Sequence, residues 1–324
     1  MAADIEATMR LIKLFGALTL LVSMGLQASD KINEVLDVPN AGQVNIQSMR
    51  GTVKVIGWDK AQVSVTGELD EKATGYTFQS DNGFTVFKVK MPNQKRINGW
   101  NDSDGSDLII YVPFDSDLTF ESVSGDVSVK EVSGGTSVHT VNGSIDAQDL
   151  SRRIRLETVN GDIKASLLYG KVHLATVNGQ ISDKSSKGKI HYETVNGNID
   201  SQTDASKVYV QNVNGEIELA LKAIEDLEVS TVNGDIDASL SLADDGSVNV
   251  TTVSGSARLR FASTVGGKFR LSSHAGGRIK NRLTDDKVVK QKYGPASSLK
   301  FTKGGGNAKV QMTTVSGNLT IEQQ

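Results

Sequence analysis

Residues 158–161 read Thr-Val-Asn-Gly, and the same four residues return at 176–179 and at 194–197, each time 18 positions further along the chain. Motifs of this kind recur with four spacings of 18 and one of 19, and they end at Gly143, Gly161, Gly179, Gly197, Gly215 and Gly234. Degenerate copies end at Gly51, Gly125, Gly255, Gly277 and Gly317. A short fixed period predicts a stack of similar units, each of which buries its apolar face against its neighbours.

Apolar residues occupy fixed positions relative to each repeat glycine. They recur two positions after it and two, five and seven positions before it, with polar residues between. This alternation is typical of strands with one buried face. We expect the valines two positions before the glycine to face inward. They are Val123, Val141, Val159, Val177, Val195, Val213 and Val232. The threonine before each valine is also expected to face inward, so the alternation of inward and outward side chains is broken between these two residues. Asn-Gly follows directly and suits a sharp bend, because both residues tolerate positive φ.

These columns predict an all-β fold: a single-chain parallel β-solenoid, or β-helix, with rungs of about 18 residues. A propeller blade needs about 40 residues, and a sandwich would not keep valine, asparagine and isoleucine in unbroken columns. Successive rungs should lie about 4.8 Å apart, with like side chains stacked on one another. Because parallel crossovers are mostly right-handed, we expect a right-handed coil.

The N-terminus has the pattern of an export signal. Arg10 and Lys13 precede an apolar core from Leu14 to Leu26, which is short for a membrane span. The acidic residues before Met9 fit a signal peptide poorly, so we expect translation to start at Met9; an uncleaved anchor helix is the alternative. The mature chain is expected to have no transmembrane segment and to be exported, either to the periplasm or to the cell surface.

The rest of the chain divides by the regularity of its repeat. We expect a signal peptide at 1–28, irregular N-terminal rungs that cap the stack at 29–120, regular repeats at 121–281, a loop insertion at 282–306 and a final rung at 307–324. A polar loop from Pro92 to Asp107 carries Trp100.

Composition excludes several classes of function. A net charge of −3 gives no bulk attraction to nucleic acid, so no nucleic-acid partner is expected. The chain has no cysteine, which excludes disulfides, thiolate metal sites and cysteine nucleophiles. It contains no G-x-S-x-G motif and no glycine-rich nucleotide loop. We therefore predict no catalytic residue and no cofactor.

One outward column is basic. Arg153, Lys171, Lys189 and Lys207 each lie eight positions before a repeat glycine, at the start of a strand. Stacked at about 5 Å, they would form a stripe able to meet phosphate or uronate groups of a polymer. The alternative is that these cations only protect exposed turns and edges.

A second outward column is acidic toward the later rungs, with Asp200, Glu216, Glu218, Asp235 and Asp237. Clustered carboxylates can hold Ca²⁺. The Gly-Gly-x-Gly-x-Asp repeat that places calcium in other solenoids is absent, so solvated charge is the preferred interpretation.

Three of the four histidines share one outward strand face with two glutamates; they are His139, His173, His191, Glu157 and Glu193. Two imidazoles and a carboxylate on adjacent rungs could ligate zinc. No H-x-x-x-H or H-E-x-x-H spacing is present, so we predict exposed histidines and no metal site.

The motif asparagines form an unbroken column: Asn142, Asn160, Asn178, Asn196, Asn214 and Asn233. We expect a structural ladder at a buried corner, in which the amides bond one another or the corner backbone. Serine replaces asparagine at Ser124, Ser254 and Ser316, as expected for atypical terminal repeats.

The Gly57-Trp58-Asp59 segment with its flanking strands, together with the Thr-Val-Asn/Ser-Gly-Asp-Ile rungs, resembles the bacterial putative-adhesin family, and the likeness runs from about Val35 to Ile321. This is a group of exported β-solenoid domains of unknown function that is similar to the GIN head domains. The resemblance implies the fold and supplies no catalytic or binding residue. It also suggests a link to cell-envelope stress signalling.

The sequence therefore predicts an exported, non-enzymatic β-solenoid of the cell envelope that binds a glycan, an envelope component or a protein. A polysaccharide-active β-helix enzyme is the first alternative. An envelope-stress accessory protein that self-associates through its end rungs is the second.

Overall fold

The computed structural model describes residues 31–92, 104–262 and 264–324. The predicted signal peptide and Trp100 lie outside these residues. Within them the chain is built of strands and turns, and no helix is long and apolar enough to cross a membrane.

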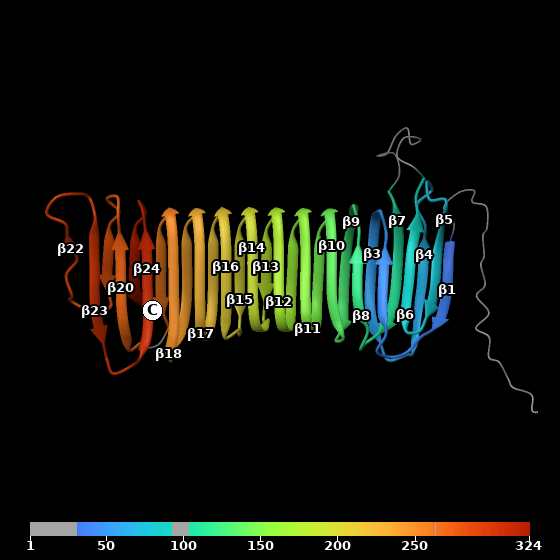
Figure 1. The fold of residues 1–324 in the computed structure, drawn as a ribbon, viewed down its shortest axis with the longest axis horizontal. Helices are drawn as coiled ribbons and strands as arrows, with labels where there is room; N and C mark the ends of the chain where they lie inside the picture. Colours follow the sequence, from blue (N-terminus) through green and yellow to red (C-terminus); the bar gives the residue numbers. More distant parts are fainter. Residues whose placement is uncertain (1–30, 93–103, 263) are drawn as a thin grey trace, which may run out of the picture.

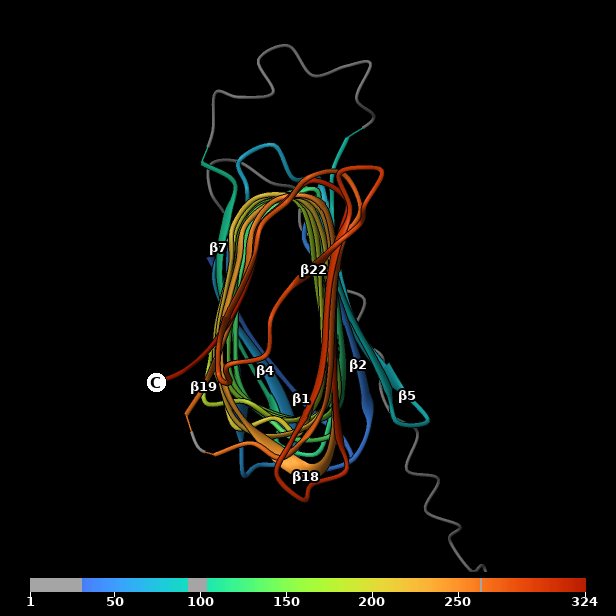
Figure 2. The same ribbon diagram turned by 90° about the vertical axis from the view of Figure 1, so that its left-hand side faces the viewer.

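The strands stack along one long axis in a flattened coil, which confirms the parallel β-solenoid (Figures 1 and 2). Each rung has one strand that leads into the Val-Asn-Gly corner and one that follows it. We call the stack of strands before the corner the leading face and the stack after it the trailing face. Identical motif positions pair across rungs, as in Asn160 with Asn178 and Ile163 with Ile181. The handedness of the coil stays a prediction.

The central strands are all parallel to their neighbours on the same face. The longest run from the trailing face through the variable turn onto the leading face. The central strands are β8 (Asp117–Glu121), β9 (Ser124–Val132), β10 (Gly135–Asn142), β11 (Ile145–Asn160), β12 (Ile163–Asn178), β13 (Ile181–Lys184), β14 (Lys187–Asn196), β15 (Ile199–Thr203), β16 (Lys207–Asn214), β17 (Ile217–Asn233), β18 (Ile236–Ser254) and β19 (Ala257–Phe261).

The N-terminal end of the stack is not in sequence order. Its strands are β1 (Lys31–Asp37), β2 (Gln43–Gln47), β3 (Arg50–Trp58), β4 (Gln62–Glu68), β5 (Gly75–Asp81), β6 (Phe84–Lys90) and β7 (Ser106–Pro113). The β2–β3 rung lies between the β6–β7 rung and the β8–β9 rung. Antiparallel pairing of β5 with β6 and of β4 with β1 and β7 closes this end.

The C-terminal end is rearranged in the same way. Its strands are β20 (Gly267–Ser273), β21 (Ile279–Arg282), β22 (Val289–Lys290), β23 (Ser297–Lys303), β24 (Ala308–Thr314) and β25 (Leu319–Gln323). The rung predicted to be final, β24–β25, is inserted between the β18–β19 rung and the β20–β21 rung. Part of the segment predicted as a loop is β23, which pairs antiparallel with β20.

The valine column was predicted wrongly. Val177, Val195 and Val232 are 38%, 40% and 41% exposed, whereas the threonine before each of them is buried. The corner therefore takes up four residues between the buried threonine and the buried isoleucine, namely valine, asparagine, glycine and the residue after it, and none of the four is buried in the Thr176–Ile181 corner. The other apolar columns fill the space between the faces, as Ile163, Leu168 and Leu174 do.

The repeat glycines let successive corners touch. A Cβ on Gly179 would lie 1.9 Å from the carbonyl oxygen of Gly161, and the equivalent positions of other rungs are as close. The same oxygen accepts a hydrogen bond of 3.0 Å from the hydroxyl of Thr176. Glycine is thus required by backbone contact between rungs, and the inward threonine satisfies a carbonyl that faces the interior.

Gly179→Ala should destabilise the protein by about 1–3 kcal/mol, because the new methyl group forces two corners apart. The measurement is the free energy of unfolding in urea. Gly305→Ala is the matched control, since a Cβ there meets nothing within 4 Å, and it should leave stability unchanged. Equal stability of the two variants would contradict the proposed contact between corners.

A buried polar group interrupts the apolar core. Asp183 on β13 is 1% exposed, and its Oδ2 accepts a hydrogen bond of 2.6 Å from the hydroxyl of Tyr192. Ser186 donates to the other oxygen, and the Tyr192 hydroxyl also lies 2.9 Å from that of Ser201. Burial raises the pKa of Asp183 to about 6, although the hydroxyl donors oppose the shift. Below about pH 6 the folded protein therefore holds this carboxyl in its neutral form.

This raised pKa makes stability depend on pH. Between about pH 4 and pH 6 the folded state holds a proton on Asp183 that the unfolded state has lost, so stability falls as pH rises through this window. At 1.36 kcal/mol per pKa unit, the expected loss is on the order of 3 kcal/mol. Urea unfolding of wild type and Asp183→Asn across this range should show a difference in stability that changes with pH. A constant difference would refute this assignment.

Candidate functional site

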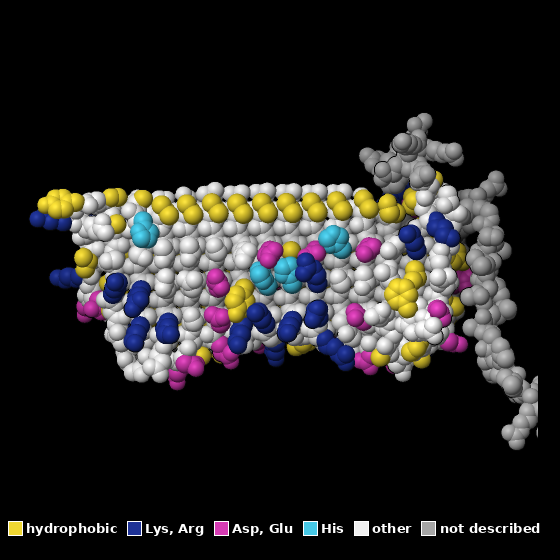
Figure 3. All heavy atoms as spheres, viewed as in Figure 1, with side chains coloured by type: hydrophobic (Ala, Val, Ile, Leu, Met, Phe, Trp, Pro, Cys, Tyr) yellow, Lys and Arg dark blue, Asp and Glu magenta, His cyan; other side chains and the backbone are white. Residues whose placement is uncertain are grey.

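The outer surface of the leading face carries the most ordered set of functional groups. Its outward positions lie eight, six, four and two residues before each repeat glycine. Figure 3 shows this face, with a continuous row of hydrophobic side chains along its upper edge and histidine, acidic and basic side chains gathered below. Each position forms a column because the strands pair in register with a spacing of about 4.8 Å.

The basic ladder, defined as Arg153, Lys171, Lys189 and Lys207, lies at the start of the leading strands. The structure pairs Arg153 with Lys171, Lys171 with Lys189, and Lys189 with Lys207, and all four side chains are exposed. The next partner in the column is Asp226, so the run of cations ends there.

Few anions neutralise this ladder. Lys207 Nζ lies 3.7 Å from the exposed Glu225 carboxylate, while the other three cations have no ion pair to any described residue. Lys189 Nζ sits 4.5 Å from the centre of the Tyr209 ring, a cation–π contact. Tyr209 in turn donates a hydrogen bond of 2.6 Å to Asp226, which raises the pKa of Tyr209 to about 12. The ladder therefore presents nearly its full positive charge to solvent.

The histidines form a chain of contacts next to the ladder. His173 and His191 are paired on β12 and β14, with ring centres 5.2 Å apart. Glu157 bridges two of them, with His173 Nε2 3.4 Å from one oxygen and His139 Nδ1 3.2 Å from the other. Glu193 Oε1 lies 2.9 Å from His191 Nε2. Burial lowers the pKa of His191 from its usual value, which favours the neutral imidazole, although Glu193 opposes the shift.

The valine ridge is the row of outward valines at the corner edge: Val123, Val141, Val159, Val177, Val195, Val213, Val232, Val253 and Val315. A shallow groove of about 690 Å³ runs beside it, between the ridge and the column that contains Glu157 and Glu193. The unbroken column of valines is visible in the sequence, but the apolar character of valine suggested that these side chains are buried.

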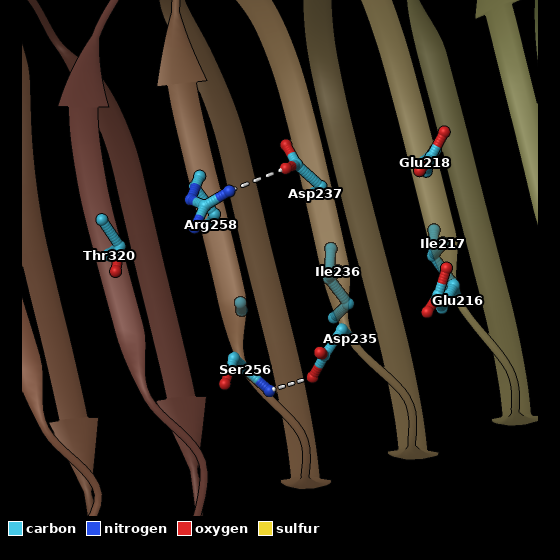
Figure 4. Close-up of a pocket in the computed structure, with 10 residues that line it drawn as sticks. Glu216, Ile217, Glu218, Asp235, Ile236, Asp237, Ser256, Arg258 and Thr320 are labelled. Atoms are coloured by element: carbon cyan, nitrogen blue, oxygen red, sulfur yellow. Dashed lines mark hydrogen bonds and ion pairs between the residues drawn. The ribbon is translucent and has the colours of Figure 1, made fainter.

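The acidic column lies on the trailing face, away from the basic ladder. Four of its members, Glu216, Glu218, Asp235 and Asp237, line a groove of about 230 Å³, drawn in Figure 4, whereas Asp200 lies outside it. Asp235 accepts a hydrogen bond of 2.7 Å from the backbone of Ser256, and Asp237 lies 3.2 Å from Arg258 Nη1. Arg260 pairs with the other oxygen of Asp237. These two carboxylates are thus engaged in contacts between rungs, while Glu216 and Glu218 extend from the strand before them.

The motif asparagines are exposed and bond one another from rung to rung. Asn160 Nδ2 donates to Asn142 Oδ1 at 2.8 Å, and the same bond repeats from Asn178 to Asn160 at 2.8 Å and from Asn196 to Asn178 at 3.0 Å. Two further bonds of 2.9 and 3.2 Å extend the ladder to Asn233. Each interior amide thus donates one hydrogen bond and accepts one within the ladder, which is the structural role that the sequence predicts. The corner is exposed and not buried as expected.

Asn178→Ala should destabilise the protein more than Asn142→Ala, because the interior amide makes two ladder bonds and the terminal one only accepts. At about 1 kcal/mol for each bond, the losses should be about 2 and 1 kcal/mol. Chemical denaturation of the two variants under one set of conditions makes the comparison. Identical losses would show that the ladder bonds contribute nothing measurable.

The chain is distantly similar to several solved structures. A putative cell adhesion protein from Clostridium sporogenes ATCC 15579 is 11% identical, with 91% of this chain and 100% of that chain covered and a TM-score of 0.26. A putative adhesin from Bacteroides fragilis NCTC 9343 is 12% identical, with 91% and 98% covered and a TM-score of 0.38. A putative lipid binding protein from Parabacteroides distasonis ATCC 8503 is 10% identical, with 90% and 96% covered and a TM-score of 0.34. Likenesses at this level carry no argument about ligands.

No curated protein matches the chain. The family model described as Toastrack DUF4097 matches residues 42–322, which is most of the chain and includes every column described above. The repeat corners, the two stacked faces and this match agree, and the chain belongs to the Toastrack DUF4097 family.

Proposed function

We propose that this protein is an exported, non-enzymatic binding protein of the cell envelope that uses the basic ladder to hold a linear polyanion. The observation that carries the proposal is the in-register run of Arg153, Lys171, Lys189 and Lys207 on an open face. A polymer with regularly spaced carboxylate or phosphate groups, such as an acidic glycan, is the ligand class that this arrangement fits.

Electrostatics supports this proposal. Like charges about 5 Å apart repel one another, and the repulsion is relieved when an anion lies along the column. Only Lys207 has an anionic partner among the described residues, and both members of that pair are largely exposed, so the pair contributes little. The negative charges of a bound polyanion would offset the repulsion between neighbouring cations, which destabilises the folded protein.

The regularity of the surface also supports binding over catalysis. A glycosidase needs two carboxyl groups that converge on one bond inside a cleft. On this solenoid neighbouring functional groups lie in parallel columns, and the grooves beside them are shallow. The carboxylates Asp235 and Asp237, which come closest to an acidic site, are already bonded to Ser256 and Arg258.

Lys171→Glu/Lys189→Glu should weaken binding of polygalacturonate by at least about tenfold, because two attractive contacts become repulsive. Affinity should also fall as salt rises, since the contacts are exposed and screened. Affinity chromatography or calorimetry with purified wild-type and variant chains gives the measurement, with neutral dextran as the uncharged polymer.

Lys268→Glu/Lys309→Glu is the matched control. Lys268 and Lys309 are exposed, paired across adjacent strands and separated from the ladder by Asp226 and Ser247, so the variant changes the net charge equally. It should keep most of the affinity. Equal losses in the two variants would mean that net charge alone drives binding, and no binding by wild type would refute the proposal.

A further inference from the structure

We propose that His173, His191 and Glu193 form a binding site for a divalent transition-metal ion such as Zn²⁺ on the outer surface of the leading face. The site uses residues other than those of the basic ladder, with two imidazoles and a carboxylate in place of cations. Neither the family match nor the distant structures assign a metal to this chain.

The fold itself brings the three ligands together. His173 and His191 are paired residues of β12 and β14, so their Cα atoms are one rung apart, and Glu193 follows His191 by two residues on the same outward side. One ligand atom from each of the three lies within 4.8 Å of the others. No long loop has to order for the site to form, because all three residues belong to the regular stack.

The distances are close to those of a coordinated ion. Zinc binds imidazole nitrogen and carboxylate oxygen at about 2.0–2.2 Å, which places the ligands of a tetrahedral site roughly 3.4 Å from one another. His191 Nε2 and Glu193 Oε1 are 2.9 Å apart and have only to spread slightly. The His173 ligand atom lies within 4.8 Å of the other two and would have to move closer to them through a change in side-chain torsion.

One nitrogen of the His191 imidazole lacks a hydrogen-bond partner among the described residues. This nitrogen, Nε2, is shielded from solvent, yet among those residues it has no partner of acceptable geometry, in spite of the short distance to Glu193. A buried polar nitrogen without a partner costs free energy. A metal ion between this nitrogen and the Glu193 carboxylate would satisfy both groups.

Glu157 supplies the support that metal-binding histidines usually have. One of its oxygens lies 3.4 Å from Nε2 of His173, a contact that can fix the ring and leave the other nitrogen to ligate. Glu157, Glu193 and Glu228 lie around the imidazoles and offset the charges of Arg155 and Lys189. Glu193 also lines the groove beside the valine ridge, which gives an ion a path from solvent.

The test is titration of the full chain, prepared without a histidine tag and stripped with chelator, with Zn²⁺ alone. We expect saturable binding of one ion per chain by calorimetry and by metal analysis after gel filtration. His173→Gln and His191→Gln should each lower the affinity by at least about tenfold, and Glu157→Gln should lower it by about tenfold through loss of orientation. Co²⁺ in the same site should give visible absorption bands that both histidine variants abolish.

His274→Gln is the control, because His274 is exposed and lies on the strand-end segment after β20, far from this cluster in sequence. Its affinity for Zn²⁺ should equal that of wild type, and circular dichroism should show the same β content in every variant. Absence of saturable binding by wild type would overturn the proposal. Binding that persists unchanged in His191→Gln, or that His274→Gln also removes, would overturn it as well.

Discussion

The contact between successive glycine corners determines the rest of this structure. Each repeat glycine lies against the carbonyl of the glycine one rung before it, closer than any side chain would permit. Backbone bonds then run from corner to corner, as from Gly161 N to Asn178 O at 3.2 Å. Because the corners cannot slide without breaking this contact, the strand segments on either side of each corner are held in register. Every column of like residues, inward or outward, follows from that register.

The sequence predicts the register well and the exact shape of the corner poorly. Isoleucine, threonine and glycine recur at one spacing. In a parallel stack each of these residues lies against the same residue type of the next rung. The direction of Val177 could not be inferred in the same way, because an apolar residue in a strand usually faces the core. Here the backbone bends over the four residues between threonine and isoleucine. Valine is left on the outside as a consequence of the bend.

The order of the terminal rungs also lay beyond the repeat pattern. Gly51 and Gly277 carry recognisable echoes of the corner, and both join the stack. Their places are set by long-range pairing of β2 with β8 and of β20 with β24, which a period along the chain does not encode. The polar cluster of Asp183 and Tyr192 did leave a signal in the sequence, since Asp183 stands between Ala165 and Ser201 in an inward column that is otherwise mostly apolar. Its partners became visible only in three dimensions.

The same regularity that builds the fold limits what its surface can do. A stack repeats each outward group at one rung spacing, so the groups of one column run parallel and do not converge. Such a surface suits a ligand that is itself linear and repetitive, such as the polyanion that we propose for the basic ladder. Convergence arises only where neighbouring columns differ from rung to rung, and the histidines beside Glu193 are one such place. On a β-solenoid, a site whose side chains converge on one small ligand is therefore expected where the residue type of an outward column changes. A site for a linear polymer is expected where the residue type stays constant.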